Sequence, residues 1–357
     1  MGEKTGIEWT DATWNPVTGC TKLSPGCDNC YAENIALRFA GTKAYPNGFE
    51  VQLRPDKLSQ PLRWKKPRRV FVNSMSDLFH KDVPDQFIAQ VWATMMLAPQ
   101  HTFQVLTKRP ARMRALLTSS VFALMVRLER DVLLGLSTPS FATPTYEVPP
   151  NVWLGVSTED QKWADLRIPT LLDTPAAVRF ISAEPLLGSI DLVGPGYIGS
   201  QRGHGGTHNG VGSADCPIET HHHHDMRCKP ALDWVIVGGE SGRDARPMHP
   251  AWPRSLLDQC TAAEVPFHFK QWGEWVPFVY GRDHPKGPSP WANREPDAYV
   301  RYENGDVATE DEAIRDGGTF TGVYRVGKKA AGRELEDSIW DGYPETRWVP
   351  AMTKGPH

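Results

Sequence analysis

Short apolar runs that end in small or polar residues recur along the chain. They cover residues 69–77, 102–109, 151–160, 177–186, 233–242 and 266–275. Continuous apolar runs of this length are typical of strands buried on both faces, as in parallel sheets. Stretches with helical character lie between several of them, at 84–98, 111–133 and 250–264. Repeated alternation of strand and helix predicts right-handed βαβ units and therefore an α/β fold with a parallel sheet.

The polar ends of the predicted strands are candidates for a functional rim. In parallel α/β folds the carboxyl ends of the strands and the loops that follow them build the site. Any one polar strand end is equally consistent with ordinary capping, whereas several facing one mouth favour a function. The residues at these ends are Asn73, Ser74, Ser76, Asp77, Thr107, Lys108, Arg109, Ser157, Thr158, Glu159, Ser182, Glu184, Gly238, Gly239, Glu240, Lys270 and Gln271.

Two stretches depart from the alternation and set the expected domain organisation. Residues 190–232 are rich in Gly and His without periodicity, which predicts a long insertion loop. Cys216, Cys228 and the run His221–His224 in this loop could form a small zinc site or a solvated tract. We expect a barrel-like domain over 1–275 and a C-terminal extension over 276–357 that packs on it. In the extension, Asn304-Gly305 predicts a hairpin with a two-residue turn.

Composition restricts the cellular setting. The chain of 357 residues has a formal net charge of -3, so it carries no global nucleic-acid signature. No apolar run is long enough to span a membrane, and the first residues do not resemble a signal peptide. We therefore expect a cytoplasmic protein with reduced thiols, where neighbouring cysteines more often hold a metal or do redox work than form bridges.

Three of the six cysteines lie within eleven residues of sequence, at Cys20, Cys27 and Cys30. A [4Fe–4S] cluster takes one thiolate per iron, so three thiolates leave one iron open to a small molecule. Gly19, Pro25 and Gly26 would let the loop turn around such a cluster. Two alternatives remain: a closed zinc site that recruits His80 or a remote cysteine, and buried thiols that bind no metal.

The cysteine loop, followed by repeated βα units, resembles the radical S-adenosylmethionine (SAM) superfamily. Members usually show C-x3-C-x2-C, whereas the first gap here has six residues. The stretches 70–86 and 103–113 resemble the second and third strands of the spore photoproduct lyase branch. With IEWTDATWNPVTGC, VIVGGESG and FKQWGEW, nearly the whole chain is similar to a phage-associated three-cysteine family of uncharacterised function. Members often sit beside a gene for a three-Cys-motif partner protein.

The resemblance implies a partial (βα)6 TIM-like barrel and a radical SAM enzyme of lyase or transferase type. Cys20, Cys27 and Cys30 would ligate a [4Fe–4S] cluster, an electron donor would reduce it, and cleavage of SAM would yield a radical that abstracts hydrogen from the substrate. The resemblance also implies which residues contact SAM. Asn73, Ser74, Ser76 and Asp77 would contact its methionine part, and Lys108 would pair with its carboxylate. Ser157 and Glu184 would bind the ribose, and Gly238 and Gly239 would let the adenine approach.

The substrate class is suggested by two basic stretches, at 63–69 and 108–114. Basic residues beside an aromatic such as Trp64 suit phosphate contact and base stacking, although a solvated charged surface explains each stretch as well. A base in a duplex would have to be flipped into a pocket, which Trp153, Trp234, Trp272 and Trp275 could line if they are not core residues. The leading hypothesis is therefore a radical SAM-type enzyme that repairs or modifies a base in a nucleic acid such as DNA. The alternative is a non-catalytic zinc or iron–sulfur protein that binds nucleic acid with a partner.

Overall fold

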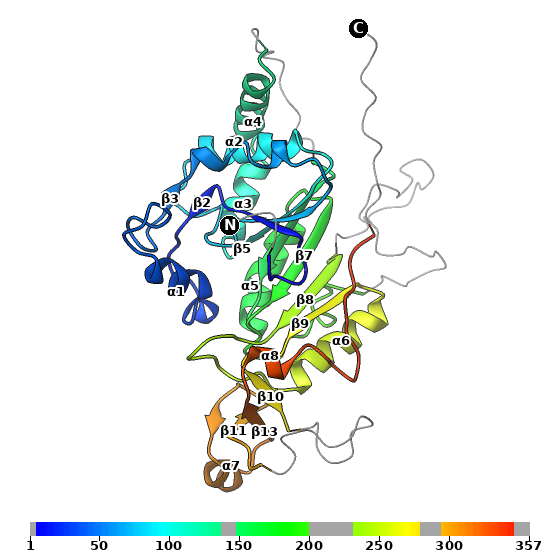
Figure 1. Ribbon diagram of the computed structural model, residues 1–357. Coiled ribbons are helices and arrows are strands. Elements are labelled where there is room, and N and C mark those ends of the chain that lie inside the picture. The colour runs from blue at the N-terminus through cyan, green and yellow to red at the C-terminus, as the bar shows by residue number, and fades with distance from the viewer. Residues whose placement is uncertain (1–4, 137–147, 200–230, 279–293, 346–357) are drawn as a thin grey trace, which may run out of the picture.

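A curled sheet of seven parallel strands forms the centre of the computed structural model, which describes residues 5–136, 148–199, 231–278 and 294–345 (Figure 1). The sheet is a half-barrel in which the strands follow one another in chain order. All six strands predicted from the apolar runs are confirmed, and the polar residues at their ends lie in the last positions of the strands or just after them. The sheet also has a first strand, β1, that no apolar run predicted. Its seven strands are β1 (Ala12–Trp14), β4 (Arg69–Val72), β5 (Thr102–Thr107), β6 (Val152–Ser157), β7 (Val178–Ala183), β8 (Trp234–Gly238) and β9 (Phe267–Gln271).

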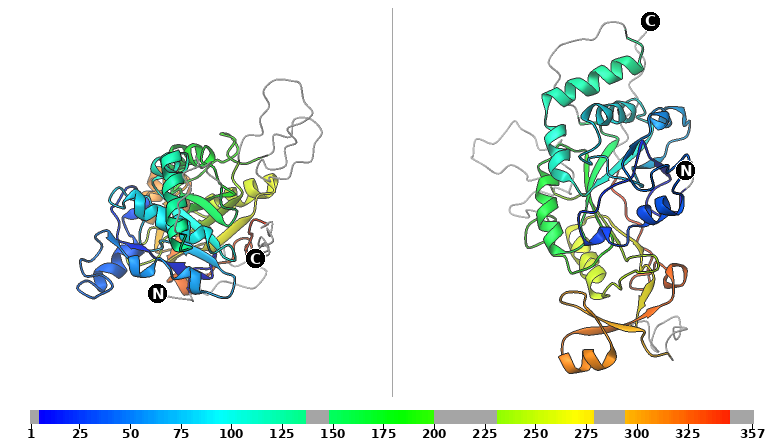
Figure 2. Two further views of the ribbon diagram at one scale, coloured as in Figure 1. Left: turned by 90° about the horizontal axis from the view of Figure 1, so that it is seen from above. Right: turned by 90° about the vertical axis from the view of Figure 1, so that its left-hand side faces the viewer.

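Helices cover the outer face of this half-barrel, as the two views of Figure 2 show. The stretch with helical character over 111–133 is helical but forms two helices. The first ends before Ser119, whose side chain accepts a hydrogen bond from the Phe122 amide and starts the second. The predictions over 84–98 and 250–264 are confirmed, and this part of the chain has two further helices, one before β4 and one between β6 and β7. The helices are α1 (Tyr31–Arg38), α2 (Asp85–Met96), α3 (Pro110–Leu117), α4 (Ser120–Leu133), α5 (Gln161–Leu172) and α6 (Ala251–Ala263).

The two faces of the sheet carry separate cores, since successive residues of a strand point to opposite sides. Val72, Val105 and Leu154 belong to the core that includes residues of the outer helices. The other, inner face holds a cluster that we call the aromatic cluster, made of Trp9, Phe71, Trp153, Phe180 and Trp234 together with Ile236. Trp153 and Trp234 are therefore core residues. Trp272 is also buried in the larger core, and the half-buried Trp275 donates through Nε1 to the Ala245 carbonyl at 2.7 Å.

A small antiparallel sheet lies at the end of the molecule remote from α2 and α4 (Figure 1). The predicted hairpin is present between its strands β11 (Ala298–Arg301) and β12 (Val307–Ala308), but the predicted two-residue turn is wrong. The Arg301 amide donates to the Asp306 carbonyl at 2.9 Å, so the chain turns over residues 302–305. The Asn304 side chain stabilises this longer turn by accepting from the Asp306 amide at 3.1 Å. The elements here are β10 (Trp275–Pro277), β11 (Ala298–Arg301), β12 (Val307–Ala308), β13 (Phe320–Arg325), α7 (Glu310–Asp316) and α8 (Lys328–Ala331).

After α8 the chain returns to the central sheet. The Phe269 amide donates to the Trp340 carbonyl, and the Gly342 amide donates to the Phe267 carbonyl, both at 2.9 Å. Residues 340–342 therefore run along the edge of β9 that no other strand of the sheet covers. Tyr343, next in sequence, packs its ring at a tilt against Trp234 of the aromatic cluster.

The predicted insertion is only partly within the described residues. Ile190, Leu192, Tyr197 and Ile198 are buried in the larger core, so the first part of the stretch packs against the half-barrel. Cys216, Cys228 and His221–His224 lie outside the described residues. None of the helices in the described ranges is long and apolar enough to cross a membrane.

Candidate functional site

The cysteine loop, residues 20–30, lies over the carboxyl edge of the half-barrel, between β2 (Val17–Thr18) and α1. β2 pairs with β3 (Gln52–Leu53), and Gly19 forms a bridge with Ser76, beyond the end of β4. Gly19 has a φ of +84°, and a Cβ there would lie 2.0 Å from the Glu50 carbonyl oxygen. Only glycine fits this entry to the loop.

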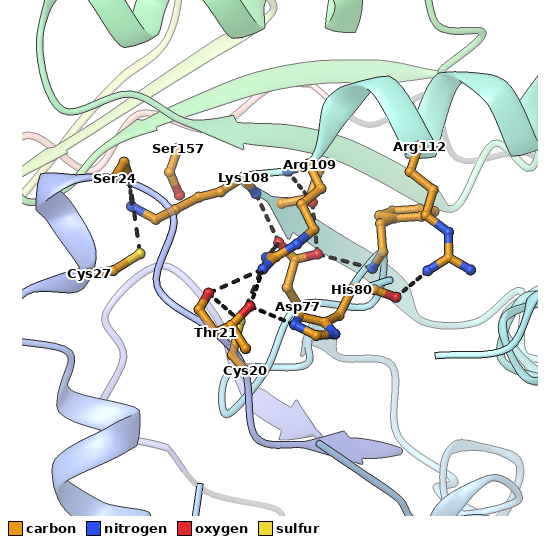
Figure 3. Close-up of polar contacts among 12 residues, drawn as sticks. Cys20, Thr21, Ser24, Cys27, Asp77, His80, Lys108, Arg109, Arg112 and Ser157 are labelled. Atoms are coloured by element: carbon orange, nitrogen blue, oxygen red, sulfur yellow. Dashed lines mark hydrogen bonds and ion pairs between the residues drawn. The ribbon is translucent and has the colours of Figure 1, made fainter. Parts of the chain in front are cut away.

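Thr21 ties the start of the loop to the residues that follow β4 and β5 (Figure 3). The Arg109 guanidinium donates through Nη2 to the carbonyl and to the hydroxyl oxygen of Thr21, at 3.1 Å each. The same hydroxyl lies 2.7 Å from Nε2 of the buried His80. Arg109 is held in turn by Asp77, whose Oδ2 accepts from Nη1 at 3.0 Å.

Asp77 is committed to hydrogen bonds with the protein on both carboxylate oxygens. Oδ1 accepts from the Thr107 hydroxyl at 2.8 Å and from the Phe79 amide at 2.9 Å, while Oδ2 accepts from the Lys108 amide at 3.1 Å and from Arg109. This buried carboxylate therefore joins the segments after β4 and β5 and positions the guanidinium that holds Thr21.

A second contact joins Ser24 to Glu159, the residue that follows β6. The Ser24 hydroxyl donates to Glu159 Oε1 at 2.7 Å, and the Glu159 carboxylate is also bound by Lys108 and, at 2.9 Å, by Arg167. Glu159 is fully buried. Burial by itself would raise the pKa of its carboxyl, but the Lys108 and Arg167 cations and the Ser24 hydrogen bond outweigh it and lower that pKa.

A third contact holds the end of the loop to the segment after β8. Arg246 donates to Glu240 Oε1 at 2.6 Å and to the Pro25 carbonyl at 2.8 Å, and it pairs with Asp28 at 3.3 Å. Asn29 donates to Glu240 Oε2 at 3.0 Å. The cysteine loop is thus tied at its start, middle and end to the segments that follow four strands of the sheet.

The three thiols are free and half-buried. Cys20 Sγ lies 3.6 Å from Arg109 Nη1, and Cys27 Sγ lies 4.0 Å from the Ser24 hydroxyl. Burial, with a smaller contribution from Asp77, raises the pKa of Cys20 to about 11, and burial also raises the pKa of Cys30. Within the described ranges no group of three His, Cys, Asp or Glu side chains is arranged to hold a metal ion, so the thiols are not gathered around one ion as they stand.

The other residues predicted at the end of β4 make contacts with the segment around β1 and β2. Asn73, at a φ of +61°, accepts through Oδ1 from the Val17 amide at 3.3 Å, and the Ser76 hydroxyl donates to the Val17 carbonyl at 2.9 Å. The Ser74 carbonyl accepts from the Tyr31 hydroxyl at 2.5 Å. The structure therefore brings these three predicted residues next to the cysteine loop and the start of α1.

The remaining predicted residues fall on the inner face of β6–β9 or just beyond it. Ser157 pairs in register with Ser182, and both are buried. Glu184 accepts a hydrogen bond from Lys270 Nζ at 2.5 Å. At Gly238 a Cβ would make ordinary contact with these two charged side chains, at 3.4 Å.

Gly239 has a different role from its neighbour. Its amide donates to the Gln271 carbonyl at 2.9 Å, and a Cβ there would lie 1.9 Å from the Trp272 carbonyl oxygen. Close packing of two backbone segments is therefore what requires this glycine.

Sequence reasoning placed Glu159 and Glu240 at polar strand ends but did not single them out as site residues. It gave no signal at all for Arg167, Arg246 and Asn29, which complete the second and third contacts. Only the polar strand-end pattern could have drawn attention to the two glutamates, because their partners lie in helices and loops of ordinary composition.

Comparison with known proteins gives the chain a family. A family model described as "Protein of unknown function (DUF5131)" matches residues 4–344. The chain belongs to this family. No curated protein and no solved structure matches this DUF5131 chain. The match spans the half-barrel, the cysteine loop and the returning C-terminal segment, so these parts form one family unit.

Proposed function

We propose that this DUF5131 chain is a radical SAM-type enzyme whose cysteine loop holds a [4Fe–4S] cluster that binds SAM at its open iron. The observation that supports this most is the position of three free thiols on one loop over the carboxyl edge of a parallel half-barrel. The proposal includes the finer features that the resemblance implies: a TIM-like barrel, a phage-associated setting, a three-Cys-motif partner and an electron donor.

The donor set fits such a cluster. Thiolates are the preferred ligands of iron–sulfur clusters, and the Arg109 guanidinium beside Cys20 would stabilise a charged thiolate. A fourth cysteine of the described chain, Cys260, is buried in the core within α6 and does not join the loop. Cys20, Cys27 and Cys30 would therefore be the ligands. When bound, the cluster and SAM would supply one-electron cleavage of SAM and hydrogen abstraction from the substrate.

The chain's own residues would position the reactants around the loop. Ser157 and Ser182 lie on the same inner face as the aromatic cluster, nearer the carboxyl edge, and the Glu184–Lys270 pair lies beyond them. These groups offer hydroxyls, a carboxylate and an ammonium to polar parts of SAM or substrate. Lys108 is bound to Glu159 in the structure, so a role toward the SAM carboxylate requires it to exchange partners.

Anaerobic reconstitution of the full chain with iron and sulfide tests this function. We expect about four irons per chain, an EPR signal of the reduced cluster that changes when SAM is added, and release of 5′-deoxyadenosine. One tightly bound zinc and no iron would overturn the proposal in favour of a zinc protein. A cluster that ignores SAM would instead identify a non-catalytic iron–sulfur protein.

For the substrate we propose a nucleic acid, supported by the basic stretch at 63–69. The stretch leads into β4 and therefore lies at the amino edge of the sheet, opposite the cysteine loop. Trp64 is buried against His101, so it does not offer a face for base stacking. Arg63, Lys65 and Lys66 are exposed and provide charge for phosphate contacts. In the other basic stretch, Lys108, Arg109 and Arg112 bind groups within the protein.

Reversing the exposed charges tests this surface. Changing Arg63, Lys65 and Lys66 together to Glu is expected to weaken binding of single- and double-stranded DNA and RNA at least tenfold at low salt. It should also reduce the slope of log Kd against log salt by about one per lost phosphate contact. The control carries the same three reversals at Arg315, Lys328 and Lys329 in the C-terminal part. Equal binding by the two variants would contradict the assignment of this surface.

A further inference from the structure

The cysteine loop is held at its start, middle and end by side chains from the segments that follow the strands, and these contacts involve no metal. We propose that the protein preorganises the backbone of this loop before a metal arrives, with Glu159 as the main positioning residue for the turn that carries Cys27. The proposal deepens the function proposed above, because it says how the cluster site is prepared. Many metal-binding loops behave differently, since they become ordered only when the ion binds.

Glu159 controls the position of Cys27 through a short path. The carboxylate accepts from the Ser24 hydroxyl at 2.7 Å, and the Ser24 carbonyl accepts from the Cys27 amide at 2.8 Å. This second bond closes the single 3-10 turn Pro25–Cys27. When the position of Ser24 is fixed, the position of the turn that contains Cys27 is fixed as well. The Cys27 thiol then lies 4.0 Å from the Ser24 hydroxyl.

The packing of Gly26 shows how closely the loop is seated on this carboxylate. A Cβ at Gly26 would lie 2.6 Å from Glu159 Cγ and Oε1 and 2.8 Å from Lys108 Nζ. The φ of Gly26 is not in the left-handed region, so the backbone conformation does not itself demand glycine. The absence of a side chain is what allows the loop to lie directly on the Glu159–Lys108 pair.

The energetics of the buried charges favour a positioning role over a stabilising one. Glu159 is fully buried and pairs with Lys108 and with Arg167, whose side chain is 1% exposed. A buried cluster of charges usually stabilises a protein no more than apolar residues of the same volume, because taking the charges out of water is costly. Its benefit here is directional, since an ionised carboxylate aimed at Ser24 fixes one place for the hydroxyl.

The other contacts of the loop make the proposal testable without unfolding the protein. Thr21 stays bound to Arg109, and Pro25 and Asp28 stay bound to Arg246, when only the contact between Ser24 and Glu159 is disturbed. Ser24→Ala removes the hydroxyl, Ser24→Thr keeps it, and Gly26→Ala pushes the turn away from the carboxylate. Gly6→Ala is the matched glycine control, since a Cβ at Gly6 has nothing within 4 Å.

Hydrogen exchange of the metal-free chain is the deciding measurement. The amides of Cys27 and Asp28 donate to backbone carbonyls within the loop, at 2.8 and 3.1 Å, and should be protected in the metal-free wild type. We expect exchange at these amides to be about tenfold faster in Ser24→Ala and faster still in Gly26→Ala, as expected when a hydrogen bond to a charged group is lost. Ser24→Thr and Gly6→Ala should match the wild type.

Two outcomes would overturn the proposal: exchange in the metal-free wild type at the rate of an unstructured peptide, or the same protection in Gly26→Ala as in Gly6→Ala. If the chain binds iron, release of iron to a chelator gives a second readout, expected to be faster in Ser24→Ala and restored in Ser24→Thr. A chain that binds no iron would defeat the proposed function, yet the exchange result would still decide whether the loop is preorganised.

Discussion

Cys27→Ala, reconstituted anaerobically, is expected to retain less than about one iron per chain where the wild type retains about four. Cys27 lies on the turn that packs against Glu159, and its loss would leave two thiols for a cluster that requires three. Cys20→Ala and Cys30→Ala should behave alike. Iron content and the visible absorption of the cluster measure the effect.

Cys260→Ala is the control for the loss of one thiol. Cys260 is buried in the core within α6, so its replacement should leave the iron content unchanged. Iron loss in Cys260→Ala equal to that in Cys27→Ala would show that iron is not held by the loop. A double variant with Ser at Cys216 and Cys228 would reveal ligands from the segment outside the described residues.

Gly239→Ala is expected to lower the free energy of unfolding by about 3 kcal/mol or more, because the new Cβ would collide with backbone. The atom it would meet, the Trp272 carbonyl oxygen, lies 1.9 Å away. That carbonyl cannot move freely, since the Trp272 amide donates to the Gly332 carbonyl at 3.2 Å and the indole donates to the Glu334 backbone carbonyl at 2.8 Å. Denaturant unfolding of the purified variant gives the value.

Gly238→Ala provides the comparison, because its Cβ would meet only side-chain atoms of Glu184 and Lys270 at ordinary distances. We expect a change in unfolding free energy below about 1 kcal/mol. If Gly239 served only to let adenine approach, Gly239→Ala would fold like the wild type and lose SAM binding alone. That result would contradict the packing role that we assign to Gly239.

The strands were predictable because both faces of the sheet are buried, which leaves continuous apolar runs in the sequence. β1 was not predicted from the apolar runs, because its three residues are too few to form a recognisable run. α5 was missed because Arg167 and Pro169 interrupt its apolar face, and its start depends on Asp160, whose side chain accepts from the Trp163 amide at 3.0 Å. Local signals of this kind are too weak to outweigh the surrounding sequence.

The candidate site was predictable as a set of positions but not as a set of partners. Polar strand ends indicated the rim, and the spacing of the cysteines indicated the loop. Lys108 binds a carboxylate 51 residues away in sequence, and Asn29 binds one 211 residues away. Such pairings follow from the curl of the sheet, which brings the ends of distant strands under one loop, and no local pattern records them.

The returning segment at 340–342 limits where the chain can be truncated. Exposed sheet edges invite pairing with other chains, and proteins avoid this by covering an edge or by keeping it short. Here β9 is covered by residues of the chain's own C-terminal part, while β1, at the opposite edge, has three residues. A chain ended after β9 would keep every strand of the half-barrel and yet expose a five-residue edge, making it prone to aggregate. The smallest soluble unit is therefore set by the protection of an edge rather than by the last strand of the sheet.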